Sequence, residues 1–172
     1  MYYIGIDPGL TGAIAILNSE GHVRQVYDMP VCPRPSGKGN MVNNFELGEI
    51  LEVVDSSGGC LCNVMVEDVH AMPGQGVTSV FSFGRSLGVV EGVFWNAGRF
   101  DYVRPQKWKK HFELLKSEKD AARELAIELF PDAAVYLQRK KDIGRADALL
   151  IARYVFDMFS GVIDSDRWRR VL

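Results

Sequence analysis

Residues 1–17, MYYIGIDPGLTGAIAIL, contain the pattern that decides the fold. An apolar run over 2–6 leads into Asp7, Pro8-Gly9 follows directly, and a second apolar run over 13–17 leads away. This pattern predicts a strand, a tight turn and a returning strand, with a carboxylate at the end of the first strand. A carboxylate beside open backbone N–H groups suits a divalent cation or a phosphate. The alternative is that Asp7 only forms the turn.

Two more acids occupy related positions along the chain. Residues 62–66 predict a short buried strand that ends in Glu67, and Asp147 lies in the first turn of a last helix that we expect to start near Gly144. Two carboxylates at strand ends of one sheet can share a metal ion. An aspartate is common in the first turn of a helix, where the helix dipole stabilises its charge. Asp147 is therefore a candidate metal ligand only because Asp7 and Glu67 are candidates too.

The remaining pattern predicts an α/β protein in which strands come first and helices dominate the second half. Residues 30–40, with three prolines and two glycines, predict a mobile loop. Ser117 is expected to cap a helix that Pro131 stops. Further strands are expected over 22–29 and 100–104, and further helices over about 43–54, 77–97 and from 105 onward.

Length and composition narrow the class of protein. The chain has 172 residues, which fits a single domain over 1–172, and 47% hydrophobic with 24% charged residues is typical of a soluble globular protein. No apolar run approaches the roughly 20 residues of a membrane span, and no signal peptide is evident. We therefore expect a cytoplasmic protein, of a bacterial cell or a phage-infected host, with no membrane partner and no organic cofactor. The cysteines, which have no zinc spacing, are expected to be reduced: Cys32, Cys60 and Cys62.

The net charge of −2 hides an asymmetry between the two halves of the chain. Residues 1–100 carry 5 Lys and Arg against 10 Asp and Glu, whereas residues 101–172 carry 15 against 12. The balances are therefore −5 and +3. A basic second half beside clustered acids permits a nucleic-acid partner, which the total charge alone would discourage.

Basic residues in the second half are candidates for contacts with phosphate. Lys107, Lys109 and Lys110 surround Trp108 on the helix that Pro105 opens. Basic residues interleaved with an aromatic favour contact with a nucleic-acid backbone, although a solvated helix face is the alternative. Lys119 is expected in the first turn of the next helix, where a cation opposes the helix dipole and a phosphate ligand would explain its presence better.

Three glycines recur every fourth residue in the helix expected over 77–97: Gly84, Gly88 and Gly92. They line one face of the helix and each costs about 1 kcal/mol relative to alanine, so the stripe needs a packing reason. Close approach to the sheet and a helix-to-helix dimer contact are both open alternatives.

The motif Ile4-Gly5-Ile6-Asp7-Pro8-Gly9-Leu10-Thr11-Gly12 resembles the opening of the RuvC-type Holliday junction resolvases and also that of the actin and sugar-kinase ATPases. The ATPases need two such domains, so the length favours the resolvases. Val66-Glu67 and the stretch GRADALLIA at 144–152 extend the resemblance over essentially the whole chain. The chain is most similar to compact bacteriophage-type and organellar members.

The resemblance implies a ribonuclease H-like fold: a five-stranded mixed sheet, three antiparallel strands then two parallel, flanked by helices. It also implies a homodimer that nicks opposed strands of a four-way DNA junction with two Mg²⁺ ions, for which Mn²⁺ can substitute. The residues expected to contact DNA are Lys107, Lys109, Lys110, Arg145, Gln75 and His70, although a lone loop histidine is often only solvated. Alternatives are a nuclease for RNA-DNA hybrids or flaps, and a junction-binding protein without activity.

Asp7, Glu67 and Asp147 match the catalytic acids of the family. Cellular bacterial members carry a fourth acid where this chain has Gly144. Some relatives carry a metal-site residue five positions before the last acid, so the resemblance assigns Asp142 as the fourth catalytic acid and metal ligand. Its alternative is an ion pair with one of the basic residues 139–141. Lys119 is expected to neutralise charge that develops on the phosphate during hydrolysis.

Overall fold

A computed structural model describes residues 1–55, 62–71, 74–118 and 120–160. Its main sheet has five strands in the order β3-β2-β1-β6-β7, with β1 at the centre. β1 pairs antiparallel with β2 and parallel with β6, β2 pairs antiparallel with β3, and β6 pairs parallel with β7. The predicted mixed sheet is thus confirmed. Its strands are β1 (Tyr2–Asp7), β2 (Ala13–Leu17), β3 (Val23–Asp28), β6 (Cys62–Glu67) and β7 (Gly98–Val103).

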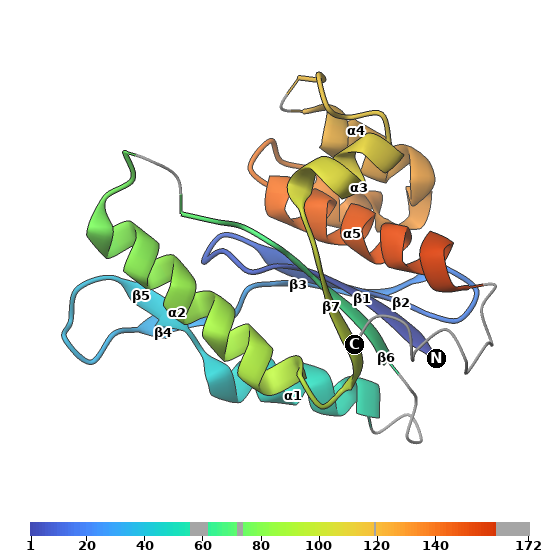
Figure 1. Cartoon of the computed structure of the whole chain (residues 1–172). Coiled ribbons are helices and arrows are strands. Elements are labelled where there is room, and N and C mark those ends of the chain that lie inside the picture. The colour runs from blue at the N-terminus through green and yellow to red at the C-terminus, as the bar shows by residue number, and fades with distance from the viewer. Residues whose placement is uncertain (56–61, 72–73, 119, 161–172) are drawn as a thin grey trace.

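Helices cover both faces of this sheet (Figure 1). On one face lie α1 (Asn44–Asp55) and α2 (Val77–Phe94). On the other lie α3 (Pro105–His111), α4 (Ala121–Leu129), the 3₁₀ helix η1 (Pro131–Leu137) and α5 (Ile143–Phe159). Two hydrophobic clusters fill the two interfaces. Among the described residues, no helix combines the length and apolar character needed to cross a bilayer.

β1 is buried on both faces because its side chains alternate between these clusters. Ile4 and Ile6 contribute to the cluster under α1 and α2, whereas Tyr3 contributes to the cluster under α5. Gly5 lets α5 approach closely, since a Cβ at this position would lie 2.2 Å from the backbone nitrogen of Ala152. The continuous apolar run before Asp7 follows from this two-sided burial.

Several expectations about local structure are wrong. The stretch over 30–40 was expected to be a mobile loop, but it belongs to a hairpin of β4 (Val31–Pro33) and β5 (Asn40–Val42). Ser117 does not cap α4, because its hydroxyl donates to the carbonyl of Leu114 and α4 begins at Ala121. Asp147 is the fifth residue of α5 and lies just beyond its first turn.

The glycine stripe of α2 faces away from the sheet. A Cβ added at Gly84, Gly88 or Gly92 would meet no atom of the described structure within 4 Å. The alternative in which these glycines bring α2 close to the sheet is therefore wrong. Of the cysteines, Cys32 is a free thiol, Cys62 is buried at the start of β6, and Cys60 lies outside the described residues.

Candidate active site

Three of the predicted acids converge at one end of the central strands. Ile6 is paired with Val66 in the parallel register of β1 and β6, so Asp7 and Glu67 leave neighbouring strands side by side. Asp147 reaches the same place from α5, which packs on β1. The negative charges of Asp7 and Glu67 both raise the pKa of Asp147, so the three carboxylates share one electrostatic environment.

Asp7 is held by the turn that follows it. The backbone N–H of Gly9 donates to Asp7 Oδ1 at 3.2 Å. Burial raises the pKa of Asp7, while the hydrogen bond from Gly9 and the charge of Lys109 act in the opposite direction. The Pro8-Gly9 turn therefore fixes a carboxylate that is largely removed from solvent.

Glu67 is oriented by the indole of Trp108. Trp108 Nε1 donates to Glu67 Oε1 at 2.9 Å, and the Trp108 side chain is fully buried. Burial raises the pKa of Glu67, and this hydrogen bond partly offsets the rise. Trp108 was expected among the exposed basic residues of a backbone-binding surface. It belongs instead to the support of the acidic site.

Asp147 has the most strongly raised pKa of the three acids. Burial is the largest cause, and with the neighbouring acids it raises the pKa of Asp147 to about 7. The charge of Lys109 opposes this rise. A carboxylate in this environment is stabilised by any additional cation, because a cation offsets both the desolvation and the repulsion.

Among the described residues, Lys109 is a cation whose charge acts on all three acids. Its charge lowers the pKa of Asp7, of Glu67 and of Asp147. Its Nζ lies 5.1 Å from the ring centroid of Trp108, and its side chain is half-buried, whereas Lys107 and Lys110 are exposed. The sequence grouped the three lysines together, but the structure separates Lys109 from the other two.

The acids fit a hard divalent cation by their chemistry. Carboxylate oxygens are the preferred ligands of Mg²⁺ and Mn²⁺, and three mutually repelling, largely buried carboxylates favour a positive ion between them. Within the described residues, no three His, Cys, Asp or Glu side chains are already arranged so that they could hold an ion. The fit therefore rests on the donor set and its electrostatics.

The packing around Gly144, three residues before Asp147, leaves no space for a side chain. A Cβ at Gly144 would lie 2.5 Å from the carbonyl oxygen of Thr11 and 3.3 Å from Asp7 Oδ2. Any side chain here would displace the Asp7 turn. The start of α5 packs directly on that turn.

Asp142 forms an ion pair with Arg139, which was the alternative to its assignment as a metal ligand. The backbone N–H of Arg139 donates to Asp142 Oδ2 at 2.8 Å, and its guanidinium donates to Oδ1 at 2.9 and 2.6 Å. The Asp142 side chain is 4% exposed. The bonds from Arg139 hold the pKa of Asp142 below its usual range, in contrast to the three acids above. In this structure Asp142 thus pairs with Arg139 and is not one of the three acids that converge at the end of β1 and β6.

Arg145 also has a structural partner. Its guanidinium donates to both carboxylate oxygens of Asp28 at 2.6 Å and to the carbonyl of Tyr136 at 3.0 Å. These bonds link α5 to the end of β3 and to η1. The predicted DNA contact of Arg145 would require it to leave these partners.

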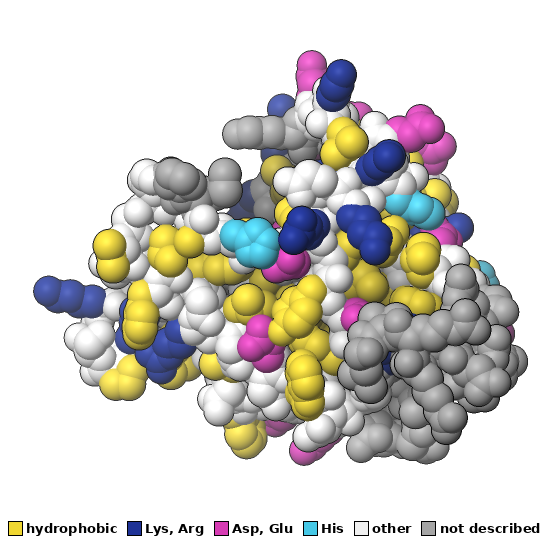
Figure 2. All heavy atoms as spheres, viewed as in Figure 1, with side chains coloured by type: hydrophobic (Ala, Val, Ile, Leu, Met, Phe, Trp, Pro, Cys, Tyr) yellow, Lys and Arg dark blue, Asp and Glu magenta, His cyan; other side chains and the backbone are white. Residues whose placement is uncertain are grey.

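His70 and Gln75 line a cavity of about 220 Å³ between the loop after β6 and the start of α2. His70 Nε2 lies 3.4 Å from Asp68 Oδ2, which also lies 3.8 Å from Arg104 Nε. Figure 2 shows Lys, Arg and His side chains gathered on this face where β7 leads into α3. His70 therefore lies in the loop that follows Glu67, and the contact of His70 and Gln75 with DNA stays a prediction. Lys119 lies outside the described residues.

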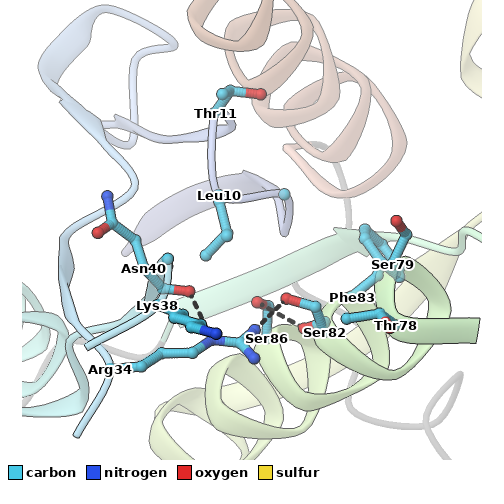
Figure 3. A pocket seen from close by; sticks show the side chains of 12 residues that line it. Leu10, Thr11, Arg34, Lys38, Asn40, Thr78, Ser79, Ser82, Phe83 and Ser86 are labelled. Atoms are coloured by element: carbon cyan, nitrogen blue, oxygen red, sulfur yellow. Dashed lines mark hydrogen bonds between the residues drawn. The ribbon is translucent and has the colours of Figure 1, made fainter. Parts of the chain in front are cut away.

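The sequence interpretation missed a polar cavity of about 540 Å³ on the α2 side of the Asp7 turn. Figure 3 shows it between that turn, the β4–β5 hairpin and α2. The available signal was the pair Arg34 and Lys38, the only Lys or Arg residues between 25 and 84. It was missed because the stretch over 30–40 was expected to be a mobile loop.

Comparison with known proteins gives relatives of one kind. No protein-family model matches the chain. A stretch of 94 residues is 38% identical to the chloroplastic Holliday junction resolvase of Chlamydomonas reinhardtii. That match covers 52% of this chain, which spans only 10% of the relative's length.

Solved structures match over nearly the whole chain. Thermus thermophilus RuvC in complex with a Holliday junction substrate has a TM-score of 0.63 and 17% identity, covering 93% of this chain and 98% of that one. Another Thermus thermophilus RuvC structure gives 0.57 and 19%, covering 92% and 96%. The yeast mitochondrial Holliday junction resolvase gives 0.51 and 12%, covering 92% and 81%. The chain therefore has the ribonuclease H-like fold of the RuvC resolvases.

Proposed function

We propose that this chain is a metal-dependent endonuclease that resolves four-way DNA junctions by hydrolysing phosphodiesters in opposed strands. The observation that carries the proposal is the convergence of Asp7, Glu67 and Asp147, with Lys109 facing them, at the end of β1 and β6. The names of the similar proteins, each a junction resolvase or RuvC, support the choice of substrate.

Asp7, Glu67 and Asp147 would hold the metal, for which we propose two Mg²⁺ ions, with Mn²⁺ able to substitute. When bound, such ions supply Lewis-acid activation of water and neutralise charge on the phosphate. The Gly9 N–H and the Trp108 indole keep two of the carboxylates oriented. This preorganisation lowers the cost of arranging the acids around substrate.

Lys109 contributes a positive charge where the scissile phosphate would lie. It already offsets the charges of all three acids, and an incoming phosphate adds negative charge to the same place. Lys107 and Lys110, which are exposed on α3, are placed to contact the DNA backbone. Lys119 retains its proposed role toward the transition state, on the sequence alone.

We also propose a homodimer, because cuts in two opposed strands require two active sites. The exposed face of α2 supplies a candidate interface with large apolar side chains at both ends of the glycine stripe: Val77, Phe81 and Trp95. Figure 2 shows hydrophobic side chains gathered over α2. Glycines between apolar anchors permit close approach of a second helix, and a symmetric contact uses the same face of both copies.

The test is cleavage of four labelled substrates by the full chain in Mg²⁺: a four-way junction, an RNA-DNA hybrid, a flap and a plain duplex. We expect symmetric nicks in the junction, dependent on metal, and little cleavage of the others. Preferential cleavage of the hybrid or the flap would favour another ribonuclease H-like nuclease. Tight junction binding without cleavage in Mg²⁺ or Mn²⁺ would favour a binding protein.

A further inference from the structure

The polar cavity beside the Asp7 turn has an unusual lining for the first half of the chain. Two basic side chains come from the β4–β5 hairpin, hydroxyls come from α2, and Gly9, Leu10 and Thr11 come from the turn. No acidic residue lines it among the described residues. The polar and basic residues of the lining are Thr11, Arg34, Lys38, Asn40, Thr78, Ser79, Ser82 and Ser86.

This concentration of positive charge runs against the local composition. Residues 1–100 carry only 5 Lys and Arg against 10 Asp and Glu, yet two of the five, Arg34 and Lys38, line this one cavity. A third, Arg85, lines a smaller cavity that shares Arg34, Ser82 and Ser86 with it. Clustered cations with hydroxyl groups and no acid form a site for an anion.

Arg34 is held in place rather than extended into solvent. Its Nε donates to the carbonyl of Asn40 at 2.9 Å, and its Nη2 donates to the hydroxyl of Ser82. These bonds engage two of the five N–H groups of the guanidinium, so within the described structure three are left for a ligand. Figure 3 shows Arg34 reaching from the hairpin to the serines of α2. A fixed guanidinium loses little entropy when it binds a phosphate.

The hairpin turn places Lys38 over the same cavity. Gly37 and Gly39, on either side of it, have φ values of 72° and 78°, which glycine adopts without strain. The Gly37 N–H donates to the Arg34 carbonyl at 2.9 Å, and the Arg34 N–H donates to the Gly39 carbonyl at 3.0 Å. These two hydrogen bonds close the turn, and both cations, Arg34 and Lys38, line the same cavity.

The cavity shares a wall with the acidic site. Gly9 lines the cavity and also donates the backbone N–H that holds Asp7. In Figure 3, Leu10 points from the turn toward Arg34 and Lys38, whereas Thr11 points away from them. A ligand in the cavity is therefore separated from Asp7 only by the turn that contains Gly9. Its volume of about 540 Å³ is within the range of ligand pockets, and Leu10 and Phe83 add apolar surface.

We propose that this cavity binds the nucleotide next to the scissile phosphate of the cut strand, with its phosphate on Arg34 and Lys38. The inference rests on the proposed nuclease function, which it deepens by adding a subsite. Arg34, Lys38 and Ser82 are then positioning residues that set the register of the strand over Asp7. The dimer face of α2 does not compete, because Ser82 and Ser86 lie on the opposite side of that helix from Gly84 and Gly88.

The first experiment tests the cavity without relying on cleavage. The full chain is titrated with the 5′-phosphorylated dinucleotide d(pTpT), followed by backbone amide NMR. We expect saturable shifts at Thr11, Ser82 and the hairpin, and at least tenfold weaker binding by Arg34→Ala. Arg24→Ala is the matched control, because Arg24 is an exposed arginine near the opposite end of the sheet, and it should bind as the parent does.

Three results of this titration would overturn the inference. They are no saturable shifts in the parent, equal weakening by Arg24→Ala, and inorganic phosphate binding as tightly as d(pTpT), which indicates a site for a free anion. Arg34→Lys keeps the charge, and Ser82→Ala keeps the arginine but removes one of its partners. Both should fall between the parent and Arg34→Ala. If Arg34→Ala alters the amide spectrum globally, the comparison rests on these two variants.

The second experiment links the cavity to cleavage. Junctions carry one neutral methylphosphonate at a time around the cut site, and KM and kcat are measured separately. We expect one position next to the cut to raise KM for the parent, and Arg34→Ala to lose sensitivity at that position only. Equal sensitivity of both proteins at every position contradicts the subsite while the nuclease stands. Binding of d(pTpT) without any junction cleavage contradicts the nuclease function, whereas the binding of a nucleotide phosphate by the cavity stands.

Discussion

Asp7, Glu67 and Asp147 are held in different ways, and this difference shapes the chemistry of the site. Asp7 accepts from Gly9, and Glu67 accepts from Trp108. Burial raises the pKa of all three carboxyls, and that of Asp147 reaches about 7. Three such groups tolerate simultaneous ionisation best when a cation binds among them.

We expect Asp7→Asn and Glu67→Gln to lose cleavage while retaining or improving junction binding. Each change removes a metal ligand and also one negative charge that repels phosphate. The loss of rate should exceed the roughly 100-fold typical of losing an outer-shell partner of a metal site. Single-turnover cleavage and a binding titration on the same junction check this. Nicking at the parent's rate by either variant would contradict the assignment.

The lysines of α3 should separate into two kinds. Lys109→Ala should lower the single-turnover rate, because Lys109 faces the three acids. Lys107→Ala and Lys110→Ala should weaken binding and reduce the slope of log K against log salt by about 1 each, as expected for single phosphate contacts. Lys119→Ala is predicted to lower the rate with little change in binding. Identical behaviour of Lys107→Ala and Lys109→Ala would remove the distinction.

Replacing Asp142 should change how the stability of the fold depends on pH, and should not change how cleavage depends on Mg²⁺. Arg139 lowers the pKa of Asp142 in the folded state, so the pair stabilises the fold above the unfolded pKa of about 3.9 and is lost as pH falls through the lower folded value. Asp142→Asn should therefore be less stable than the parent at pH 7, with the difference shrinking below about pH 4. Urea unfolding at pH 7, 4 and 3 measures this.

The same variant tests the metal assignment that the sequence favoured. With Asp142 engaged by Arg139, cleavage by Asp142→Asn should depend on Mg²⁺ concentration as in the parent. A higher Mg²⁺ requirement would restore Asp142 as a ligand.

At the scale of elements, the contact of α5 with β1 and its turn positions the acids. Gly5 and Gly144 are the two points where this contact leaves no room for a Cβ, against Ala152 and Thr11 respectively. α5 carries Asp147 and β1 carries Asp7, so their separation is set by backbone packing. A small shift of the helix changes that separation directly.

Gly144→Ala should destabilise the fold by about 1–3 kcal/mol, the usual cost of overpacking a close contact. Its Cβ would lie 2.5 Å from the Thr11 carbonyl oxygen. Cleavage should fall even where the variant is fully folded, because the Asp7 turn is displaced. Gly48→Ala on α1 is the control, since its Cβ meets nothing within 4 Å, and it should be neutral or stabilising by up to about 1 kcal/mol. Thermal unfolding measures the loss of stability, and single-turnover rates of the folded variants measure the loss of cleavage.

At the scale of the whole molecule, the exposed face of α2 has no covering element among the described residues. Val77 and Phe81 are 85% and 69% exposed near its start, and Trp95 is 60% exposed just after its end. The apolar side chains and the glycines between them follow one helical face. A second copy of the chain, placed by a two-fold axis, would bury this face on both copies at once.

We expect Gly88→Leu to sediment as a monomer and to lose paired incision while retaining its fold. A leucine at this position projects outward, where it would hold two α2 helices apart. Gly48→Leu adds the same side chain to α1 and should leave the association unchanged. A Gly88→Leu variant that is a fully active dimer would place the interface elsewhere.

Local patterns in the sequence determined the main sheet and its chemistry. The strands before Asp7 and Glu67 are continuously apolar because they are buried on both faces, and the acids lie at their ends, where the chain leaves the core. Such features depend on a few consecutive residues, so they can be predicted without knowing what packs against them.

Only the tertiary structure decided which partners the polar side chains take. Arg145 binds Asp28, 117 residues away, Trp108 is buried on Glu67, and the glycine stripe of α2 points outward. Arg34 meets Ser82 only because the hairpin folds beside α2. Each of these contacts joins residues, or faces of a helix, whose meeting depends on how whole elements pack. A helix pattern identifies the face that residues share, but the packing of the chain decides whether that face meets the sheet or solvent.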